Sequence, residues 1–294
     1  MKLLVTGAAS FVGQELVKQC DRLGYEHVGI DIAAAAQDPR TVDIRDPDLA
    51  ASIPEGLDAV IHLAAISRDP DCRRDPVACY DVNVAGTVNV FQAAHARGAR
   101  QFIFASSEWV YDSFDPVLAK SEDDPIDCSR LTSDYALSKL AAESALRIRH
   151  LQTGMPVTVL RFGIIYGPRP AQWSAVETLL AAVAGGGPVT VGSKATARCF
   201  IHVGDIARGI LAAIGRPGHD IINLQAEAPI SLGQIIGGSA DLLGLRPEII
   251  ETDPAHPSIR NVSGEKAKFL LGWRPRIGLS AGLESIADYL DMRK

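Results

Sequence analysis

The sequence predicts an α/β protein built on a doubly wound parallel sheet, and three observations support this fold class. Residues 3–5 are an apolar run without alternation, typical of a strand buried on both faces, and a small-residue turn and a helical pattern follow them. Similar apolar runs alternate with helical patterns along the chain. Small or polar residues follow several of these runs, where ligands bind in open α/β sheets. We therefore expect a Rossmann-type sheet in residues 1–166 and a smaller C-terminal α/β substrate lobe in residues 167–294, with some strands or helices crossing back to the first domain.

Composition limits the classes of protein and partner. The 294 residues are 47% hydrophobic and 22% charged, which is typical of a globular chain. A net charge of −6 without a Lys/Arg cluster argues against nucleic acid or anionic membrane as a partner. The chain begins in its first strand and has no apolar run of membrane-spanning length, so we expect a cytoplasmic protein.

The five cysteines form no C-x-x-C pair and are odd in number. This pattern predicts reduced thiols, with neither a disulfide framework nor a zinc site. No metal site is expected. The cysteines are Cys20, Cys72, Cys79, Cys128 and Cys199.

The first turn, residues 6–13, has the sequence TGAASFVG. A strand, a tight turn and a helix place unpaired backbone N–H groups at a helix N-terminus, which attracts phosphate. Gly7 is expected to let the turn close, and Gly13 to let the helix lie tightly on the sheet. Ser10 replaces the middle glycine of G-x-x-G-x-x-G, and its hydroxyl can cap the helix or bind a phosphate.

The next strand, residues 27–30, ends at Asp31, 18 residues beyond Gly13. A carboxylate there can accept both adenosine ribose hydroxyls and would repel the 2′-phosphate of NADP, so NAD is the predicted cofactor. Residues 41–42 precede Asp43 and Asp46, which mark either the end of a third strand or a loop with capping aspartates before a helix at residues 47–52.

A buried strand at residues 58–65, DAVIHLAA, ends in small residues that leave space for a cofactor. His62 within it is interpreted as a packed core residue. A long helix is predicted over residues 75–98, with Gly98 as its stop. The strand at residues 101–105 runs into SSEWVY, which places hydroxyls and a carboxylate at a ligand-binding edge.

Tyr135 and Lys139 lie four residues apart in a helix opened by Ser133 and Asp134, so they share one helix face. An ammonium near a phenol lowers its pKa, which predicts a general acid–base that works near neutral pH. Y-x-x-x-K is a common chance spacing. Its position, one loop after Ser107 and behind a nucleotide-type turn, favours the catalytic interpretation.

Beyond residue 166 the alternation is less regular. The predicted strands are residues 157–162, 189–191, 200–203 and 221–224, and the predicted helices are residues 174–184, 205–214, 232–243 and 279–290, with another helix ending at residues 270–275.

The chain resembles the extended short-chain dehydrogenase/reductase family, which contains NAD-dependent nucleotide-sugar epimerases and dehydratases. The matching stretches are TGAASFVG (6–13), DAVIHLAA (58–65), NVAGTVNV (83–90), ASSEWVY (105–111), YALSK (135–139), RFGIIYGPR (161–169), RCFIHVGDIA (198–207) and LLGWRP (270–275). Several short motifs in the family's order are more specific than any single one.

The resemblance implies roles for individual residues. Tyr135 is the implied acid–base, Lys139 its partner and ribose ligand, and Ser107 a hydrogen-bond donor to the reacting hydroxyl. The implied catalytic residues are therefore Ser107, Tyr135 and Lys139. The implied substrate-binding residues are Ser107, Glu108, Tyr135 and Arg198, and Arg198 is the arginine that binds the sugar-nucleotide diphosphate. Asp31 is expected to bind the adenosine ribose and Asp43 the adenine, and the full set of implied cofactor-binding residues is Gly7, Ser10, Phe11, Val12, Asp31, Ile32, Asp43, Ile44, Leu63, Ala64, Ala65, Tyr135, Lys139, Phe162 and Ile165.

Three features besides Ser10 depart from the family pattern on the substrate side. Ile164 replaces an asparagine that commonly contacts the diphosphate, and Cys199 replaces an aspartate. The segment at residues 191–198 is one residue short and lacks the aromatic residue that faces the base.

The predicted function is nucleotide-sugar 4-epimerisation through a transient ketone. The alternatives are an NAD-dependent dehydrogenase of a free sugar or uronic acid, a nucleotide-sugar dehydratase, for which Glu108 supplies half of an acidic pair, and an NAD-sensing regulator, which the intact catalytic residues disfavour. Relatives pair the helices at residues 75–98 and 135–150 between subunits, so we expect a homodimer.

Overall fold

The computed structural model describes residues 1–33, 38, 40–115, 118–170 and 174–292. Within these residues the chain divides into two units. The first comprises residues 1–113, 122–162 and 207–222, and the second comprises residues 114–121, 163–206 and 223–294. The chain enters the second unit at residues 114, 163 and 223, and the boundary expected after residue 166 stays a prediction.

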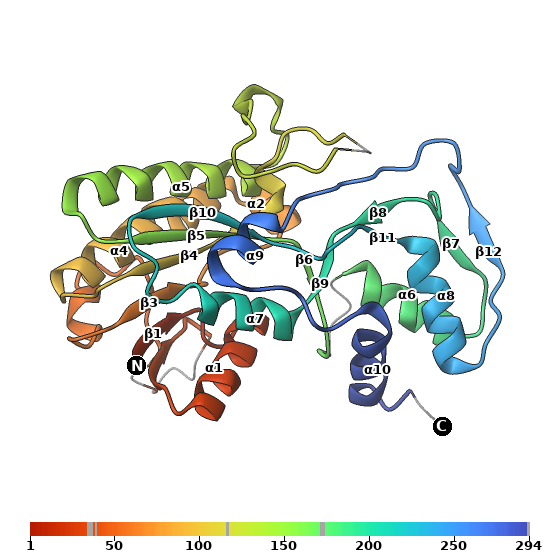
Figure 1. The fold of residues 1–294 in the computed structure, drawn as a ribbon, viewed down its shortest axis with the longest axis horizontal. Coiled ribbons are helices and arrows are strands. Elements are labelled where there is room, and N and C mark those ends of the chain that lie inside the picture. Colours follow the sequence, from red (N-terminus) through yellow and green to blue (C-terminus); the bar gives the residue numbers. More distant parts are fainter. Residues whose placement is uncertain (34–37, 39, 116–117, 171–173, 293–294) are drawn as a thin grey trace. The chain divides into compact units, whose positions relative to one another are not determined.

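A six-stranded sheet with the order β10–β5–β4–β3–β1–β2 forms the centre of the first unit (Figure 1). Adjacent strands from β2 to β5 pair in parallel. This confirms the predicted Rossmann-type architecture. The strands are β1 (Lys2–Thr6), β2 (Glu26–Ile30), β3 (Ala59–His62), β4 (Phe102–Ser107), β5 (Val157–Phe162) and β10 (His219–Leu224).

Helices cover both faces of this sheet, with α5 on one side and α1 on the other (Figure 1). Leu4 of β1, Phe91 of α4 and Leu146 of α5 belong to one core cluster. Because successive strand side chains alternate between faces, the complete burial of residues 3–5 confirms that β1 is covered on both sides. The helices of this unit are α1 (Phe11–Leu23), α2 (Asp69–Arg74), α3 (Pro76–Tyr80), α4 (Thr87–Ala96) and α5 (Asp134–Thr153), with short 3₁₀ turns at Leu49–Ser52, Glu108–Val110 and Cys128–Arg130.

The second unit packs three helices around its own apolar core, which contains Tyr166, Leu180, Ile235 and Ile286. Its strands form two-stranded sheets, β6 with β9, β7 with β12, and β8 with β11. The strands are β6 (Ile164–Tyr166), β7 (Val189–Val191), β8 (Ala197–Arg198), β9 (Phe200–His202), β11 (Ile230–Ser231) and β12 (Ile249–Glu251). The helices are α6 (Ala175–Ala184), α8 (Leu232–Leu243), α9 (Glu265–Leu271) and α10 (Leu279–Tyr289). One further helix, α7 (Val203–Ala212), begins in this unit and ends in the first.

Two predicted elements are wrong in detail. Residues 41–43 form no strand, because the Asp43 carboxylate accepts hydrogen bonds from the Arg45 backbone and side chain and stabilises a loop instead. The loop interpretation of this segment is therefore correct. The helix predicted over residues 75–98 contains a π-helical segment, Asp81–Gly86, between α3 and α4. Gly98 ends this run with a φ of +72°, as predicted.

The prediction that all five cysteines are reduced is wrong for one pair. Cys72 of α2 and Cys79 of α3 form a disulfide, whereas Cys20, Cys128 and Cys199 are free thiols. The sequence pattern did not predict α2, and the turn between the two helices brings the Cα atoms of the pair to 5.0 Å.

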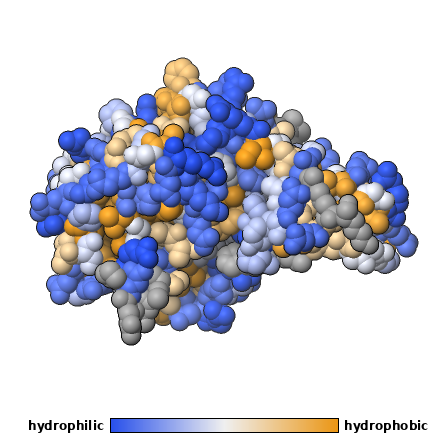
Figure 2. Space-filling model, turned by 90° about the horizontal axis from the view of Figure 1, so that it is seen from below, coloured by the Kyte–Doolittle hydropathy of each residue, from blue (hydrophilic) through white to orange (hydrophobic). Residues whose placement is uncertain are grey.

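Among the described residues, no helix is long and apolar enough to cross a membrane. The molecular face in Figure 2 is mostly hydrophilic, with apolar residues scattered between polar ones.

Candidate active site

The turn after β1 is closed by two glycines, as predicted. Gly7 has a φ of +72°, and a Cβ atom there would lie 2.7 Å from the backbone nitrogen of Ala64. A Cβ atom at Gly13 would lie 2.3 Å from the carbonyl oxygen of Gly7. A side chain at Gly7 would therefore collide with the backbone after β3, and a side chain at Gly13 would displace α1 from the turn. Ser10 is the N-cap of α1, because its hydroxyl accepts a hydrogen bond of 3.1 Å from the Gly13 N–H.

The turn also fixes the end of β3, where small residues were expected to admit a cofactor. The Leu63 N–H donates to the carbonyl oxygen of Thr6 at 3.1 Å, and the Ala64 N–H donates to its hydroxyl at 3.3 Å. His62 is 1% exposed and bonds Thr6 and Thr87 through its two ring nitrogens. Burial lowers the pKa of His62 to about 3, so it is a neutral core residue, as predicted.

Asp31 directly follows β2 and lies next to the turn. Its carboxylate accepts hydrogen bonds from the N–H groups of Ala9 (2.9 Å) and Ala33 (2.8 Å). A cavity of about 390 Å³ lies beside it. The cavity is lined by Ala8, Ala9, Val17, His27, Val28, Gly29, Asp31 and Arg40. Turn, helix N-terminus, carboxylate and cavity together fit the adenosine and diphosphate of a dinucleotide.

The other expected cofactor residues have different surroundings. Asp43 is held by Arg45, with contacts of 3.0 Å to Nε and 2.6 Å to Nη2, and this hydrogen bonding lowers the pKa of Asp43. An adenine amino group would therefore share the Asp43 carboxylate with Arg45. Phe11 and Val12 open α1 and are half-buried, Ile32 is exposed, Ile44 and Phe162 are buried, and Ile165 lies in β6 of the second unit.

Ser107, Tyr135 and Lys139 come together at the end of β4 and the start of α5. The Ser107 hydroxyl interacts with the Tyr135 phenol and favours its ionised form. The Lys139 Nζ atom lies 5.9 Å from the centre of the Tyr135 ring and donates a hydrogen bond of 2.9 Å to the carbonyl oxygen of Ala105. The structure thus places all three predicted catalytic residues in one unit.

The protein alone does not lower the pKa of Tyr135, contrary to the expectation from Lys139. Burial raises the pKa of Tyr135 to about 12, and the Ser107 hydroxyl opposes this rise only partly. Burial also lowers the pKa of Lys139 to about 8, partly offset by the charge of Glu143. Desolvation therefore dominates the pKa of both groups.

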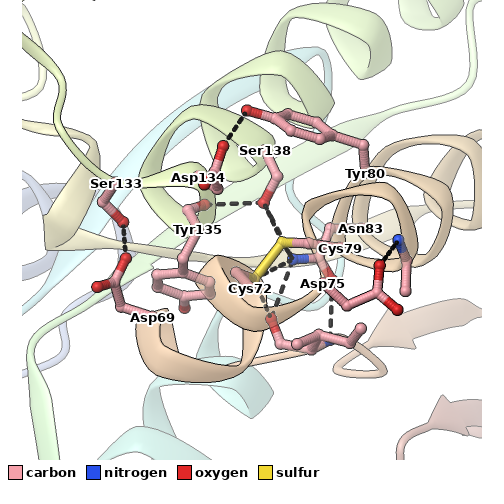
Figure 3. The surroundings of a disulfide bond; sticks show 12 residues. Asp69, Cys72, Asp75, Cys79, Tyr80, Asn83, Ser133, Asp134, Tyr135 and Ser138 are labelled. Atoms are coloured by element: carbon pink, nitrogen blue, oxygen red, sulfur yellow. Dashed lines mark hydrogen bonds between the residues drawn. A yellow bond between two sulfur atoms is a disulfide. The ribbon is translucent and has the colours of Figure 1, made fainter.

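The first turns of α5 are held by α2, α3 and the π-helical segment (Figure 3). The Ser133 hydroxyl donates to Asp69 at 2.5 Å, and the Tyr80 hydroxyl donates to Asp134 at 3.1 Å. The Ser138 hydroxyl accepts from the Asn83 amide at 3.0 Å and lies 3.7 Å from the sulfur of Cys79. Sequence reasoning missed these supporting contacts. A buried asparagine within a helical run was the available signal.

Glu108 and Arg198, the remaining predicted substrate residues, lie in different units. Glu108 is fully buried next to Ser107. Arg198 donates to the carbonyl oxygen of Ser258 at 2.5 Å and to its hydroxyl at 3.1 Å. Arg260, which sequence reasoning missed, follows on the same paired segment, since its N–H donates to the carbonyl oxygen of Ala197 at 3.1 Å.

Comparison with known proteins identifies the family. Residues 3–224 match the NAD dependent epimerase/dehydratase family, and the chain belongs to it as an enzyme of that family. It is 28% identical to a UDP-glucuronate 4-epimerase of Thermodesulfobacterium geofontis, covering 97% of this chain and 95% of that protein. It is also 28% identical to a dTDP-glucose 4,6-dehydratase of Streptomyces griseus, covering 96% and 91%.

A solved structure with the same fold is the UDP-glucose 4-epimerase of Thermus thermophilus in complex with NAD. It has a TM-score of 0.84 and 26% identity, with 99% of each chain covered. The family model assigns the family, and equal identity to an epimerase and to a dehydratase does not select between their two reactions.

Proposed function

We propose that this chain is an NAD-dependent nucleotide-sugar 4-epimerase. The observation that carries the proposal is the grouping of Ser107, Tyr135 and Lys139 in the unit that also holds the nucleotide-type turn. Gly7 and Gly13 lack the Cβ atoms that would collide with the neighbouring backbone, so the turn can close, and the Asp31 carboxylate accepts an N–H of that turn; this arrangement fits NAD. Relatives of this chain named as epimerases support the same reaction class.

Each catalytic residue has a role that follows from its chemistry. When bound, oxidised NAD supplies a hydride acceptor and a positive charge. Tyr135 takes the proton of the substrate C4 hydroxyl at its phenol oxygen, and Ser107 donates a hydrogen bond to the same substrate oxygen. Lys139 stabilises the phenolate and binds the cofactor ribose. The hydride lost from C4 would be held by the bound cofactor and would return to the opposite face of the ketone after the ketone has rotated in the site, while Tyr135 returns the proton to the oxygen.

Arg198 is the proposed diphosphate ligand. A guanidinium offers a planar fork of donors that matches phosphate oxygens. Arg260, whose guanidinium carbon lies 5.1 Å from the centre of the Phe114 ring, adds a second cation to this part of the second unit. The two arginines support a nucleoside diphosphate as part of the substrate.

A dehydrogenase of a free sugar or uronic acid is the second candidate, and Cys199 is the observation that favours it. The Cys199 thiol is fully buried, with its sulfur 3.8 Å from the carbonyl oxygens of Arg260 and Val262. It therefore gives a substrate none of the polar contacts that an aspartate offers. Ile164 likewise presents no polar group to a diphosphate.

Product analysis and competition test these candidates together. A 4-epimerase interconverts two nucleotide sugars without accumulating NADH, a dehydrogenase accumulates NADH, and a dehydratase releases a 4-keto-6-deoxy product. We expect uridine diphosphate or another nucleoside diphosphate to inhibit the enzyme and Arg198→Ala to remove that inhibition. The matched control is Lys194→Ala, an exposed cation four residues earlier that pairs with Glu251.

The size of the effect also has an expected value. Arg198→Ala should raise KM for the nucleotide sugar more than tenfold, about 1.4 kcal/mol of lost binding, with NAD affinity unchanged. If no nucleoside diphosphate inhibits the wild-type enzyme and NADH accumulates with a free sugar, the dehydrogenase is the correct assignment.

A further inference from the structure

Glu143 and Arg161 form a buried ion pair that contacts Ser106, the residue before Ser107. Arg161 donates to the Glu143 carboxylate from Nε at 3.0 Å and from Nη2 at 2.7 Å. The two side chains are only 3% and 4% exposed. The same carboxylate accepts a hydrogen bond of 2.5 Å from the hydroxyl of Ser106. The pair is therefore desolvated, bidentate and bonded to the residue that precedes Ser107.

The pair connects the three elements on which the active site is built. Glu143 lies one helical turn after Lys139 on α5, and Arg161 lies opposite Ser106 in the parallel pairing of β5 with β4. The Lys139 ammonium bonds the carbonyl oxygen of Ala105, the residue before Ser106. Ala105 and Ser106 of β4 are thus hydrogen-bonded to Lys139 and Glu143, which lie on successive turns of α5. These two hydrogen bonds together set the distance between Ser107 and Lys139.

A buried ion pair of this kind is not expected to stabilise the fold more than a pair of apolar residues would. Removing two charges from water costs several kcal/mol per ion, and replacing a buried ion pair by apolar residues of similar volume is often neutral or stabilising. What an apolar pair lacks is a charge beside Lys139 and an acceptor for Ser106. The negative charge of Glu143 favours the ammonium form of Lys139, and burial disfavours it.

We infer that Glu143 and Arg161 are positioning residues, which hold Ser107 and Lys139 in register. Arg161 fixes the Glu143 carboxylate through two hydrogen bonds. The inference rests on the catalytic roles proposed above for Ser107 and Lys139.

Two variants separate positioning from support of the fold. Glu143→Gln keeps the shape of the side chain but removes its charge, and the double variant Glu143→Leu with Arg161→Met removes both charges together. We expect the double variant to unfold in urea at a concentration close to that of the wild type. Its kcat should nevertheless fall at least about tenfold, which corresponds to about 1.4 kcal/mol.

The pH dependence of kcat is the readout that a purely structural role would not move. The wild-type rate should fall on the alkaline side as Lys139 loses its proton. Because the Glu143 charge raises the pKa of Lys139, this fall should begin at lower pH in Glu143→Gln. The control is Arg216→Met with Asp220→Leu, which removes a 2.7 Å ion pair of the same unit and should change neither readout.

The outcomes are distinct from those of the proposed function. If Tyr135→Phe abolishes activity but the folded double variant keeps kcat within about threefold and the wild-type pH profile, the positioning role is overturned and the proposed function stands. If Tyr135→Phe itself retains normal turnover, the catalytic assignment fails first. If the double variant does not fold, Glu143→Gln decides by the same pH profile.

Discussion

The ammonium group of Lys139 donates a hydrogen bond of 2.9 Å to the carbonyl oxygen of Ala105, two residues before Ser107. This contact joins the helix that carries Tyr135 to the strand that carries Ser107. An ammonium has three donors, so a ribose can be bound as well. The same contact holds Lys139 in a buried position, where its pKa is lowered to about 8.

Tyr135→Phe tests the proposed acid–base. The substitution removes the hydroxyl and keeps the ring, which packs edge-on against Trp109 at 6.3 Å between ring centres, so folding and NAD binding should survive. We expect kcat to fall by at least about a hundredfold. Lys139→Met should weaken NAD binding as well as turnover. Near-normal turnover by Tyr135→Phe would refute the mechanism.

Cofactor choice tests the role of Asp31. The carboxylate already accepts two backbone N–H groups, which hold it beside the turn, and it should repel a 2′-phosphate. By calorimetric titration we expect NAD to bind at least about tenfold more tightly than NADP, and Asp31→Ser to remove most of that preference. Asp241→Ser, which removes an exposed carboxylate of the second unit, is the control. Equal binding of both cofactors by the wild type would contradict the argument.

His62 predicts a pH-dependent stability. Its pKa in the folded protein is about 3, against a usual value near 6.5, so between these values the unfolded chain binds more protons. The free energy of unfolding should therefore decrease as pH is lowered from about 6.5, by up to about 1.4 kcal/mol per pH unit. Urea unfolding of His62→Gln should show a shallower slope, and the exposed His256→Gln should retain the wild-type slope. Identical slopes for all three proteins would exclude His62 as the cause.

The disulfide predicts a thiol count. Denatured, unreduced protein should react with a thiol reagent at the three free cysteines, and at five after reduction. Because the bond closes a short loop, Cys72→Ser with Cys79→Ser should lower the free energy of unfolding by about 2 kcal/mol. Cys128→Ser, at an exposed free thiol, should have little effect. Five reactive thiols without reduction would show that the bond does not form.

Exposed apolar residues on α5 predict a homodimer. Leu137, Ile148 and Leu151 are 38%, 47% and 67% exposed, and their spacings of 11 and 3 residues place them along one helix face. Light scattering at micromolar concentration should give twice the chain mass. Ile148→Glu with Leu151→Glu should give a monomer, and Phe269→Ser, at an 87% exposed position of the other unit, should not. A monomeric wild type would refute the prediction.

Local patterns in the sequence were sufficient for the nucleotide-type turn. The closing role of Gly7, the tight packing at Gly13 and the cap at Ser10 follow from steric and hydrogen-bonding preferences within a few residues. The core position of His62 was also predictable, since it lies in an unbroken apolar run. The grouping of Ser107 with Tyr135 needed one further premise, that a polar strand end and the next helix meet at one edge of a parallel sheet.

What the sequence by itself determined is therefore the fold class and the turn, because these depend on periodicity and on residues close in the chain; the catalytic roles of Ser107, Tyr135 and Lys139 stay a prediction. Only the tertiary structure decided the Cys72–Cys79 bond, the loop at Asp43 and the Glu143–Arg161 pair. Each of these depends on which side chains the folded backbone brings within bonding distance. The pKa values of Tyr135 and Lys139 belong to the same group, because burial dominates them and burial is a property of the packed molecule.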